Sequence, residues 1–235
     1  DIGKKVIMEI SMQIKGIALD KALDYVIKNP EENGIKLLDW IDKIAADGAR
    51  GFPSQRKVIR EILNDKDNNM YKLIMNVFND IDSDVIKTVF KNFFLNASIL
   101  GWPRQVEYRE KLNCNIPWAI LMDPTSACNL YCTGCWAAKY GKKLNLTFDE
   151  LSDIVRQGKE FGTYMYIFSG GEPLVRKDDI IKLCEKYNDC QFLAFTNGTL
   201  IDEKFADEML RVKNFVPAIS VEGFEEATDF RRGKG

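Results

Sequence analysis

Histidine is absent from the 235-residue chain. This excludes Ser-His-Asp triads, His-paired cysteine nucleophiles, histidine-ligated zinc and imidazole bases supplied by these residues. Long apolar runs are also missing. The best candidates, residues 116–122 and 164–168, are far shorter than the roughly 18–20 residues that a membrane-spanning helix needs. The first residues carry no secretory signal pattern. We therefore expect a cytoplasmic protein without a membrane partner.

A net charge of appreciable size is lacking as well. The chain has 33 Lys and Arg residues against 35 Asp and Glu residues, for a net charge of −2. This near-neutral balance argues against nucleic acid as a partner. Hydrophobic residues make up 46% of the chain, which is ordinary for a globular protein and excludes a disordered chain or a disulfide-rich miniprotein.

Residues 1–110 are expected to form an all-α helical domain. The clearest helix has Val85, Val89, Phe93 and Ala97 at helical spacing, and the motif Gly101-Trp102-Pro103 predicts its end. No cluster of convergent polar side chains occurs in this half of the sequence. We expect it to serve as a packing domain.

Residues 116–235 show a different pattern, in which short apolar runs alternate with amphipathic helical segments. Such alternation predicts an α/β fold with a parallel sheet or barrel. A capping box at residues 147–150 opens one of the helices. The expected strands are residues 116–122, 164–168, 192–195 and 215–221. Pro217 counts against the last strand, because proline removes a ladder donor.

Three of the six cysteines lie close together, directly after the first predicted strand. Cys128, Cys132 and Cys135 are separated by three and then two residues, so one loop can present three thiolates to an iron–sulfur cluster. A structural zinc site is the alternative, with Cys114 as a distant fourth ligand. The competing hypothesis for the whole chain is a non-catalytic iron–sulfur or zinc protein with a helical partner-binding domain.

Polar or glycine-rich segments also follow the other three predicted strands. Because ligands collect at the carboxyl ends of parallel strands, we expect these segments to form one rim of one pocket. They are Gly170-Gly171-Glu172-Pro173, Thr196-Asn197-Gly198 and Ser220-Val221-Glu222-Gly223.

The cysteine spacing followed by Gly170-Gly171-Glu172-Pro173 resembles the radical S-adenosylmethionine (SAM) superfamily. The resemblance implies a [4Fe-4S] cluster on the three cysteines, with SAM chelating the open iron. It also implies reductive cleavage of SAM to a 5′-deoxyadenosyl radical that abstracts hydrogen from a substrate. A small electron donor such as a ferredoxin or flavodoxin is implied as a partner. This chemistry needs no histidine.

The same resemblance assigns SAM contacts residue by residue. Gly170 to Pro173 match the segment near the SAM amino group, and Thr196 and Asn197 lie on the same rim. Ser220 and Glu222 match ribose contacts, and Arg232 matches the partner of the SAM carboxylate. The family usually has an aromatic residue before the last cysteine, where this chain has Gly134. We therefore expect Trp136 to stack near the adenine instead, the alternative being that it packs at the first helix.

The segments around Gly170, Ser220 and Arg232 most resemble family members that carry a cysteine-rich C-terminal extension and often mature peptides. The substrate is therefore expected to be a peptide or a cofactor precursor, in an oxidoreductase or maturase reaction. The family barrel has six βα units, and about four strands fit between residues 116 and 235. We accordingly expect a helical domain plus the first four units of a partial barrel from a longer enzyme.

Overall fold

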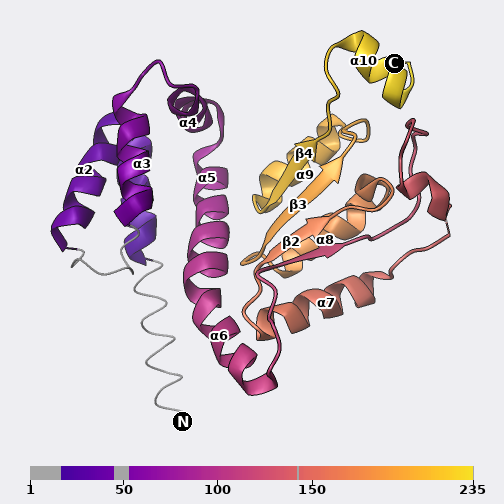
Figure 1. Cartoon of the computed structure of the whole chain (residues 1–235), viewed down its shortest axis with the longest axis horizontal. Helices are drawn as coiled ribbons and strands as arrows, with labels where there is room; N and C mark the ends of the chain where they lie inside the picture. The colour runs from indigo at the N-terminus through magenta and orange to yellow at the C-terminus, as the bar shows by residue number, and fades with distance from the viewer. Residues whose placement is uncertain (1–16, 45–52, 142, 235) are drawn as a thin grey trace. The chain divides into compact units, whose positions relative to one another are not determined.

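The computed structural model describes residues 17–44, 53–141 and 143–234 (Figure 1). The chain divides into two compact units, Asp1–Lys87 and Thr88–Gly235, and each is described by itself. Parts of the expected helical domain, residues 1–16 and 45–52, lie outside the described residues. Among the described helices, none combines the length and the hydrophobicity needed to span a bilayer.

The first unit is helical throughout its described residues. Residues 17–28 are helical, and they are followed by α2 (Pro30–Ile44), α3 (Pro53–Asn64), α4 (Asn69–Asp80) and the start of α5 (Ser83–Phe90). A small core of Leu38, Leu63 and Tyr71 holds α2, α3 and α4 together. Salt bridges from Arg60 to Asp39 and Asp42 link α3 to α2 at the surface.

The second unit is built on a four-stranded parallel sheet whose strand order follows the chain order. The strands are β1 (Ala119–Met122), β2 (Met165–Phe168), β3 (Gln191–Thr196) and β4 (Phe215–Ile219). The intervening helices are α7 (Phe148–Glu160), α8 (Lys177–Lys186) and α9 (Glu203–Val212), and α10 (Glu225–Arg232) follows β4. The chain therefore has the expected α/β fold with a partial parallel barrel.

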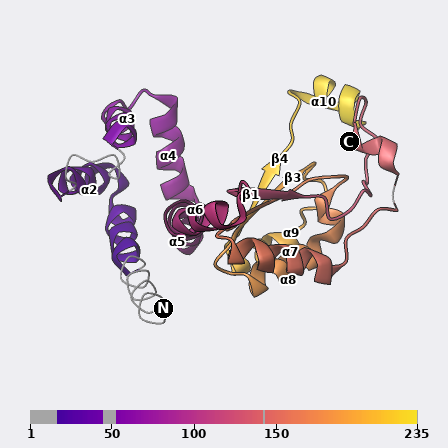
Figure 2. The same cartoon turned by 60° about the horizontal axis from the view of Figure 1, so that its bottom comes forward.

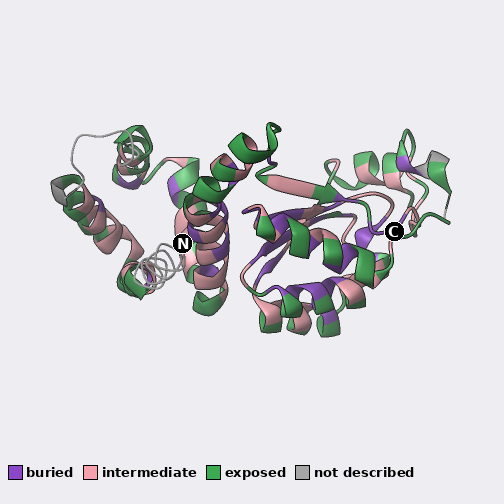
Figure 3. Cartoon of the chain, turned by 90° about the horizontal axis from the view of Figure 1, so that it is seen from below, coloured by how far each residue is buried: buried purple, intermediate pink, exposed green. Residues whose placement is uncertain are grey.

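The main core lies between the sheet and the helices α7, α8 and α9, which cover one face of the sheet (Figure 2). Side chains of alternate strand residues point into this core, with Tyr166, Phe168 and Phe192 stacked at its centre. Buried residues are concentrated between the sheet and these helices (Figure 3). The capping box of Thr147 and Glu150 fixes the residue at which α7 begins, and the apolar side of the helix faces this core.

The amino ends of β2 and β3 are covered by helical chain that precedes the sheet. This segment is the π-helical stretch η2 (Lys91–Leu100), which runs into α6 (Gly101–Leu112). Buried Asn92 donates to the carbonyl oxygens of Asn188 and Cys190, both at 2.9 Å. Buried Gln105 donates to the carbonyl oxygen of Gly162 at 2.8 Å. These amides anchor residues 91–112 to the sheet unit.

The expected helix end at Gly101-Trp102-Pro103 is wrong, because the chain stays helical from α5 through η2 into α6. Pro103 lies near the start of α6, directly after the π-helical stretch η2, and does not end the helix. Gly101 instead permits close packing, since a Cβ there would lie 2.3 Å from the carbonyl oxygen of Gly162.

Two strands differ in detail from the prediction. The first is shorter than residues 116–122, and Trp118 before it donates its indole N–H to the carbonyl oxygen of Ala97 at 3.1 Å. The last strand accommodates Pro217. The backbone groups of Asn214 and Ser220 hydrogen-bond to β3. Because backbone groups alternate in direction along a strand, the even-numbered residues of β4 direct their N–H and C=O groups toward β3. The backbone of Pro217, which has no N–H, is directed away from β3, so no ladder bond is lost there.

Candidate functional site

The carboxyl ends of the four strands lie at one edge of the sheet, because the strands are parallel and adjacent in chain order. Each strand end carries one of the segments singled out from the sequence. The cysteine loop follows β1, the Gly-Gly-Glu-Pro segment follows β2, a polar turn follows β3, and the Ser220–Glu222 segment follows β4. The fold therefore brings the four segments to a common rim.

The cysteine loop presents three unpaired thiols. Cys128, Cys132 and Cys135 are all free and partly exposed. The backbone N–H of Leu130 points at the Cys128 Sγ atom at 3.4 Å, and burial raises the pKa of the Cys128 thiol above its ordinary value. In the described residues, no three His, Cys, Asp or Glu side chains converge on a point that would hold a single metal ion. A set of three soft thiolate donors on one short loop has the chemistry that an iron–sulfur cluster requires.

The end of β2 packs against the start of the cysteine loop at backbone distance. Gly171 donates to the carbonyl oxygen of Thr125 at 3.0 Å, and Glu172 donates to that of Ala127 at 2.8 Å. A Cβ on Gly171 would lie only 2.2 Å from the Ala127 oxygen. Gly170 has φ of +99°, and a Cβ there would also meet the loop, at 2.8 Å from the Thr125 oxygen. Both glycines are therefore required by the approach of the two segments.

The Glu172 side chain is directed into the protein and is only 2% exposed. Its Oε1 atom accepts from the Leu174 backbone N–H at 3.0 Å and from the Thr196 hydroxyl at 2.7 Å. Its Oε2 atom accepts from the Asn197 backbone N–H at 2.8 Å. Both carboxylate oxygens thus join the end of β2 to the end of β3. Pro173, also buried, starts the short 3₁₀ helix η4 (Pro173–Arg176).

The polar turn after β3 contacts the cysteine loop through side chains. Asn197 donates from Nδ2 to Oδ1 of Asn129 at 2.9 Å, and Asn129 donates from Nδ2 to the Thr199 hydroxyl at 2.8 Å. The Thr199 hydroxyl in turn donates to Oδ1 of Asn197 at 2.7 Å. Asn129 lies between Cys128 and Cys132. Asn129 and Thr199 were not among the residues predicted from the sequence, although the asparagine between two expected cysteine ligands was a visible signal.

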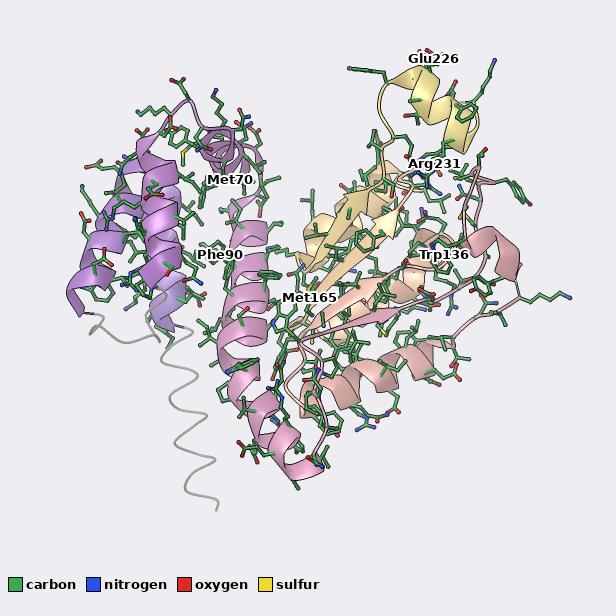
Figure 4. The ribbon with its side chains drawn as sticks, viewed as in Figure 1. Met70, Phe90, Trp136, Met165, Glu226 and Arg231 are labelled. Carbon is green, nitrogen blue, oxygen red and sulfur yellow. The ribbon has the colours of Figure 1, made fainter. Side chains whose placement is uncertain are left out.

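The segment after β4 forms an ion-pair cluster with the end of α10. Glu222 accepts from Arg231 at 2.9 Å and from Arg232 at 2.5 Å, and the Arg232 guanidinium holds the pKa of this carboxyl below its ordinary value. Thr133 of the cysteine loop donates its backbone N–H to the Arg231 carbonyl oxygen at 2.7 Å. Arg231 and Trp136 both lie at the carboxyl end of the strands (Figure 4).

Two residues expected to contact different parts of one cofactor, Glu222 and Arg232, are thus paired with each other. Glu222 is shared by two arginines, so the cluster carries one positive charge in excess. The Nε atom of Arg232 is buried without a hydrogen-bond partner among the described residues. Ser220, the other expected ribose contact, donates its backbone N–H to Thr196 at 2.9 Å and so continues the ladder past the end of β4.

Trp136 lies on the wall of a cavity of about 700 Å³ beside the cysteine loop. The cavity is also lined by Tyr140, Asp123, Gly170 and Gly171, and the two aromatic rings meet edge to face at 5.8 Å between centroids. The Trp136 side chain is 57% exposed, so a flat ring can reach its face. The structure therefore brings Trp136 and the two glycines to one cavity, whose lining does not include the segments after β3 and β4.

Comparison with known proteins gives a family match for the part of the chain that contains the sheet. The sequence model of the radical SAM superfamily matches residues 122–235. Among curated relatives, an uncharacterized protein of Archaeoglobus fulgidus is 33% identical over 48% of this chain and 28% of its own length. The Fe-coproporphyrin III synthase of Methanosarcina barkeri is 30% identical over 48% of this chain and 29% of its own length. The chain thus spans less than a third of these relatives.

Two further matches complete the comparison. The PqqA peptide cyclase of Bradyrhizobium diazoefficiens is 31% identical over 47% of this chain and 30% of its own length. Among solved structures, Streptococcus suis SuiB bound to its precursor peptide SuiA is 22% identical and superposes with a TM-score of 0.49, over 56% of this chain and 31% of SuiB.

Proposed function

Residues 122–235 belong to the radical SAM superfamily, and we propose that this chain binds a [4Fe-4S] cluster through Cys128, Cys132 and Cys135 and holds SAM against the neighbouring strand ends. The observation that carries the proposal is the set of three free, partly exposed thiols on the loop after β1. The start of this loop packs against the backbone of Gly171. When bound, the cluster and SAM supply a 5′-deoxyadenosyl radical for hydrogen abstraction.

The chain's own residues have distinct tasks in this proposal. Gly170 and Gly171 leave their backbone accessible on the cavity wall, and Trp136 offers an exposed ring face for the adenine. Arg232 is the proposed partner of the SAM carboxylate, which is supported by the excess positive charge of its cluster; its unpartnered Nε atom is buried, so binding through that atom requires the side chain to move. Glu172 acts from beneath, by fixing the ends of β2 and β3.

Glu222 and Ser220 remain the proposed ribose contacts. The two oxygens of Glu222 are engaged by Arg231 and Arg232, so binding through this carboxylate requires at least one arginine to exchange partners. The described contacts of Ser220 use its backbone N–H, which leaves its hydroxyl for a ligand. An external one-electron donor such as a ferredoxin or flavodoxin completes the proposed reaction.

The proposed substrate is a peptide or a cofactor precursor, in an oxidoreductase or maturase reaction. Support comes from the names of relatives, which include a peptide cyclase and an Fe-coproporphyrin III synthase. The chain spans under a third of each of these relatives, so the substrate is proposed for the whole protein.

Anaerobic reconstitution with iron and sulfide tests the proposal. We expect a brown chromophore with about four irons per chain, and 5′-deoxyadenosine after addition of SAM and dithionite. Cys132→Ala should abolish both signals, whereas Cys114→Ala, at an exposed cysteine outside the loop, should retain them. Retained cluster and SAM cleavage in Cys132→Ala would refute the ligand assignment. Zinc in place of iron would favour the non-catalytic alternative.

A further inference from the structure

A closed ring of side-chain hydrogen bonds joins the cysteine loop to the turn after β3. Asn197 donates to Asn129, Asn129 donates to Thr199, and Thr199 donates back to Asn197, at 2.9, 2.8 and 2.7 Å respectively. Each of the three side chains is a donor to one neighbour and an acceptor from the other. Hydrogen bonds arranged head to tail in this way polarise one another and act as a unit.

The direction of the ring is fixed by the backbone of the turn. The Thr199 N–H also donates to Oδ1 of Asn197 at 2.9 Å, so that atom must be the carbonyl oxygen of the amide. The Asn197 amide then presents its NH₂ group to Asn129, which accepts only through its own oxygen. Reversing the Asn129 amide would place two NH₂ groups face to face. The ring therefore selects one orientation of Asn129.

The turn itself is fixed from the protein interior. The buried Glu172 carboxylate accepts from the Asn197 backbone and from the Thr196 hydroxyl, and that hydroxyl accepts from the Gly198 backbone at 3.0 Å. Asn197 is thereby held from below by a buried charge while its side chain reaches the loop. The ring transmits this anchorage to the stretch between Cys128 and Cys132.

We propose that Asn129 and Thr199 are positioning residues for the iron–sulfur cluster, an inference that rests on the proposed function. Backbone contacts hold the loop on either side, through Ala127 to Glu172 and through Thr133 to Arg231. The ring secures the stretch between these two contacts, where the first two cysteines lie. It sets the spacing of their thiols and so slows release of the cluster.

Thr199 offers a matched pair of variants. Thr199→Val keeps the shape and removes the hydroxyl, which breaks one donated and one accepted bond of the ring, whereas Thr199→Ser keeps both. The reconstituted full chain is exposed anaerobically to an iron chelator, and cluster loss is followed by the decay of its visible absorbance. We expect Thr199→Val and Asn129→Ala to lose the cluster about five- to tenfold faster than wild type, as expected for the loss of one hydrogen-bonded unit.

Two controls separate positioning from general stability. Thr199→Ser and Asn188→Ala, the latter at an exposed turn residue before β3, should lose the cluster at the wild-type rate. The combined variant Asn129→Ala/Thr199→Val should decay no more than about twofold faster than either single variant, because one break already opens the ring. Melting temperatures of the cluster-free proteins should agree with that of wild type.

The outcomes distinguish this inference from the function on which it rests. If wild type takes up no iron, the proposed function fails. If wild type holds a cluster and Thr199→Val releases it as slowly as Thr199→Ser, the positioning role is refuted. It is equally refuted if faster release appears only together with a lower melting temperature, or if the effects of the two single variants multiply in the combined variant.

Discussion

Gly171→Ala should push the cysteine loop away from the end of β2. A Cβ at this position would lie 2.2 Å from the carbonyl oxygen of Ala127, and Cβ atoms essentially never approach within 3.0 Å. The loop must therefore move outward by about 1 Å, which stretches the hydrogen bond from Glu172 to Ala127. Overpacking of this kind costs about 1–3 kcal/mol. For a unit of this size we expect the melting temperature to fall by about 3–10 °C.

The measurement is thermal unfolding of the metal-free chain by circular dichroism, followed by iron uptake on reconstitution. Gly134→Ala is the matched control: Gly134 lies in the same loop with φ of +74°, and no atom lies within 4 Å of the Cβ it would gain. Its cost is that of the left-handed backbone alone, about 1–2 kcal/mol. Gly171→Ala should also lower iron occupancy, since it displaces Cys128. If Gly171→Ala melts and binds iron as wild type does, the two segments do not approach as closely as argued.

Three further predictions concern other contacts of the same unit. The pKa of Glu222 is lowered by Arg232, so their pair persists above that lowered pKa and is lost as the pH falls through it, below the ordinary value of 4.5; the hydrogen-exchange protection factor of the Thr133 amide in the metal-free chain should fall there, and Glu222→Gln should lower it at neutral pH. Glu172→Gln should cost about 2–3 kcal/mol in urea unfolding, because an NH₂ group then faces backbone and hydroxyl donors; an unchanged midpoint would contradict this. Asn92→Ala should cost about 1–3 kcal/mol by the same measurement, because the part-buried Asn188 carbonyl oxygen loses this donor and the buried Cys190 carbonyl oxygen keeps only that of Asn214, and a cost below that range would count against the docking of η2.

The α/β part of the fold, residues 116–235, could be predicted because its sequence signals are local. Alternating apolar runs located β2 and β3 within one residue at each end, and α7 begins at the predicted capping box of Thr147. Parallel strands in chain order then place the four following segments at one edge without further information. The cysteine loop and Gly171 are neighbours for this reason.

The contacts of η2 and α6 could not be predicted in the same way. Asn92 and Gln105 bond to carbonyl groups 57 to 98 residues further along the chain, and such pairs leave no periodic mark in the sequence. Gly101 and Pro103 are ordinary helix-ending residues by local rules. The close packing of Gly101 depends on the turn at Gly162 before β2, which lies beside it only in the folded chain. The ring of Asn129 and Thr199 was missed for the same reason, since the two residues are 70 positions apart.

The two acidic residues of the site, Glu172 and Glu222, differ in burial and in their hydrogen-bond partners. Glu172 is buried, and both its oxygens are used by donors whose positions the strands fix, so it can only support the site. Glu222 lies at the rim and shares two arginines, which leaves Arg232 with an unpartnered nitrogen and the cluster with one positive charge in excess. The excess positive charge favours a carboxylate ligand beside this cluster, whereas the buried Nε atom of Arg232 is not open to it in this arrangement. The α10 contact thus depends on an ion pair at the rim, whereas the cysteine loop depends on the buried carboxylate of Glu172 and on the close approach of Gly171.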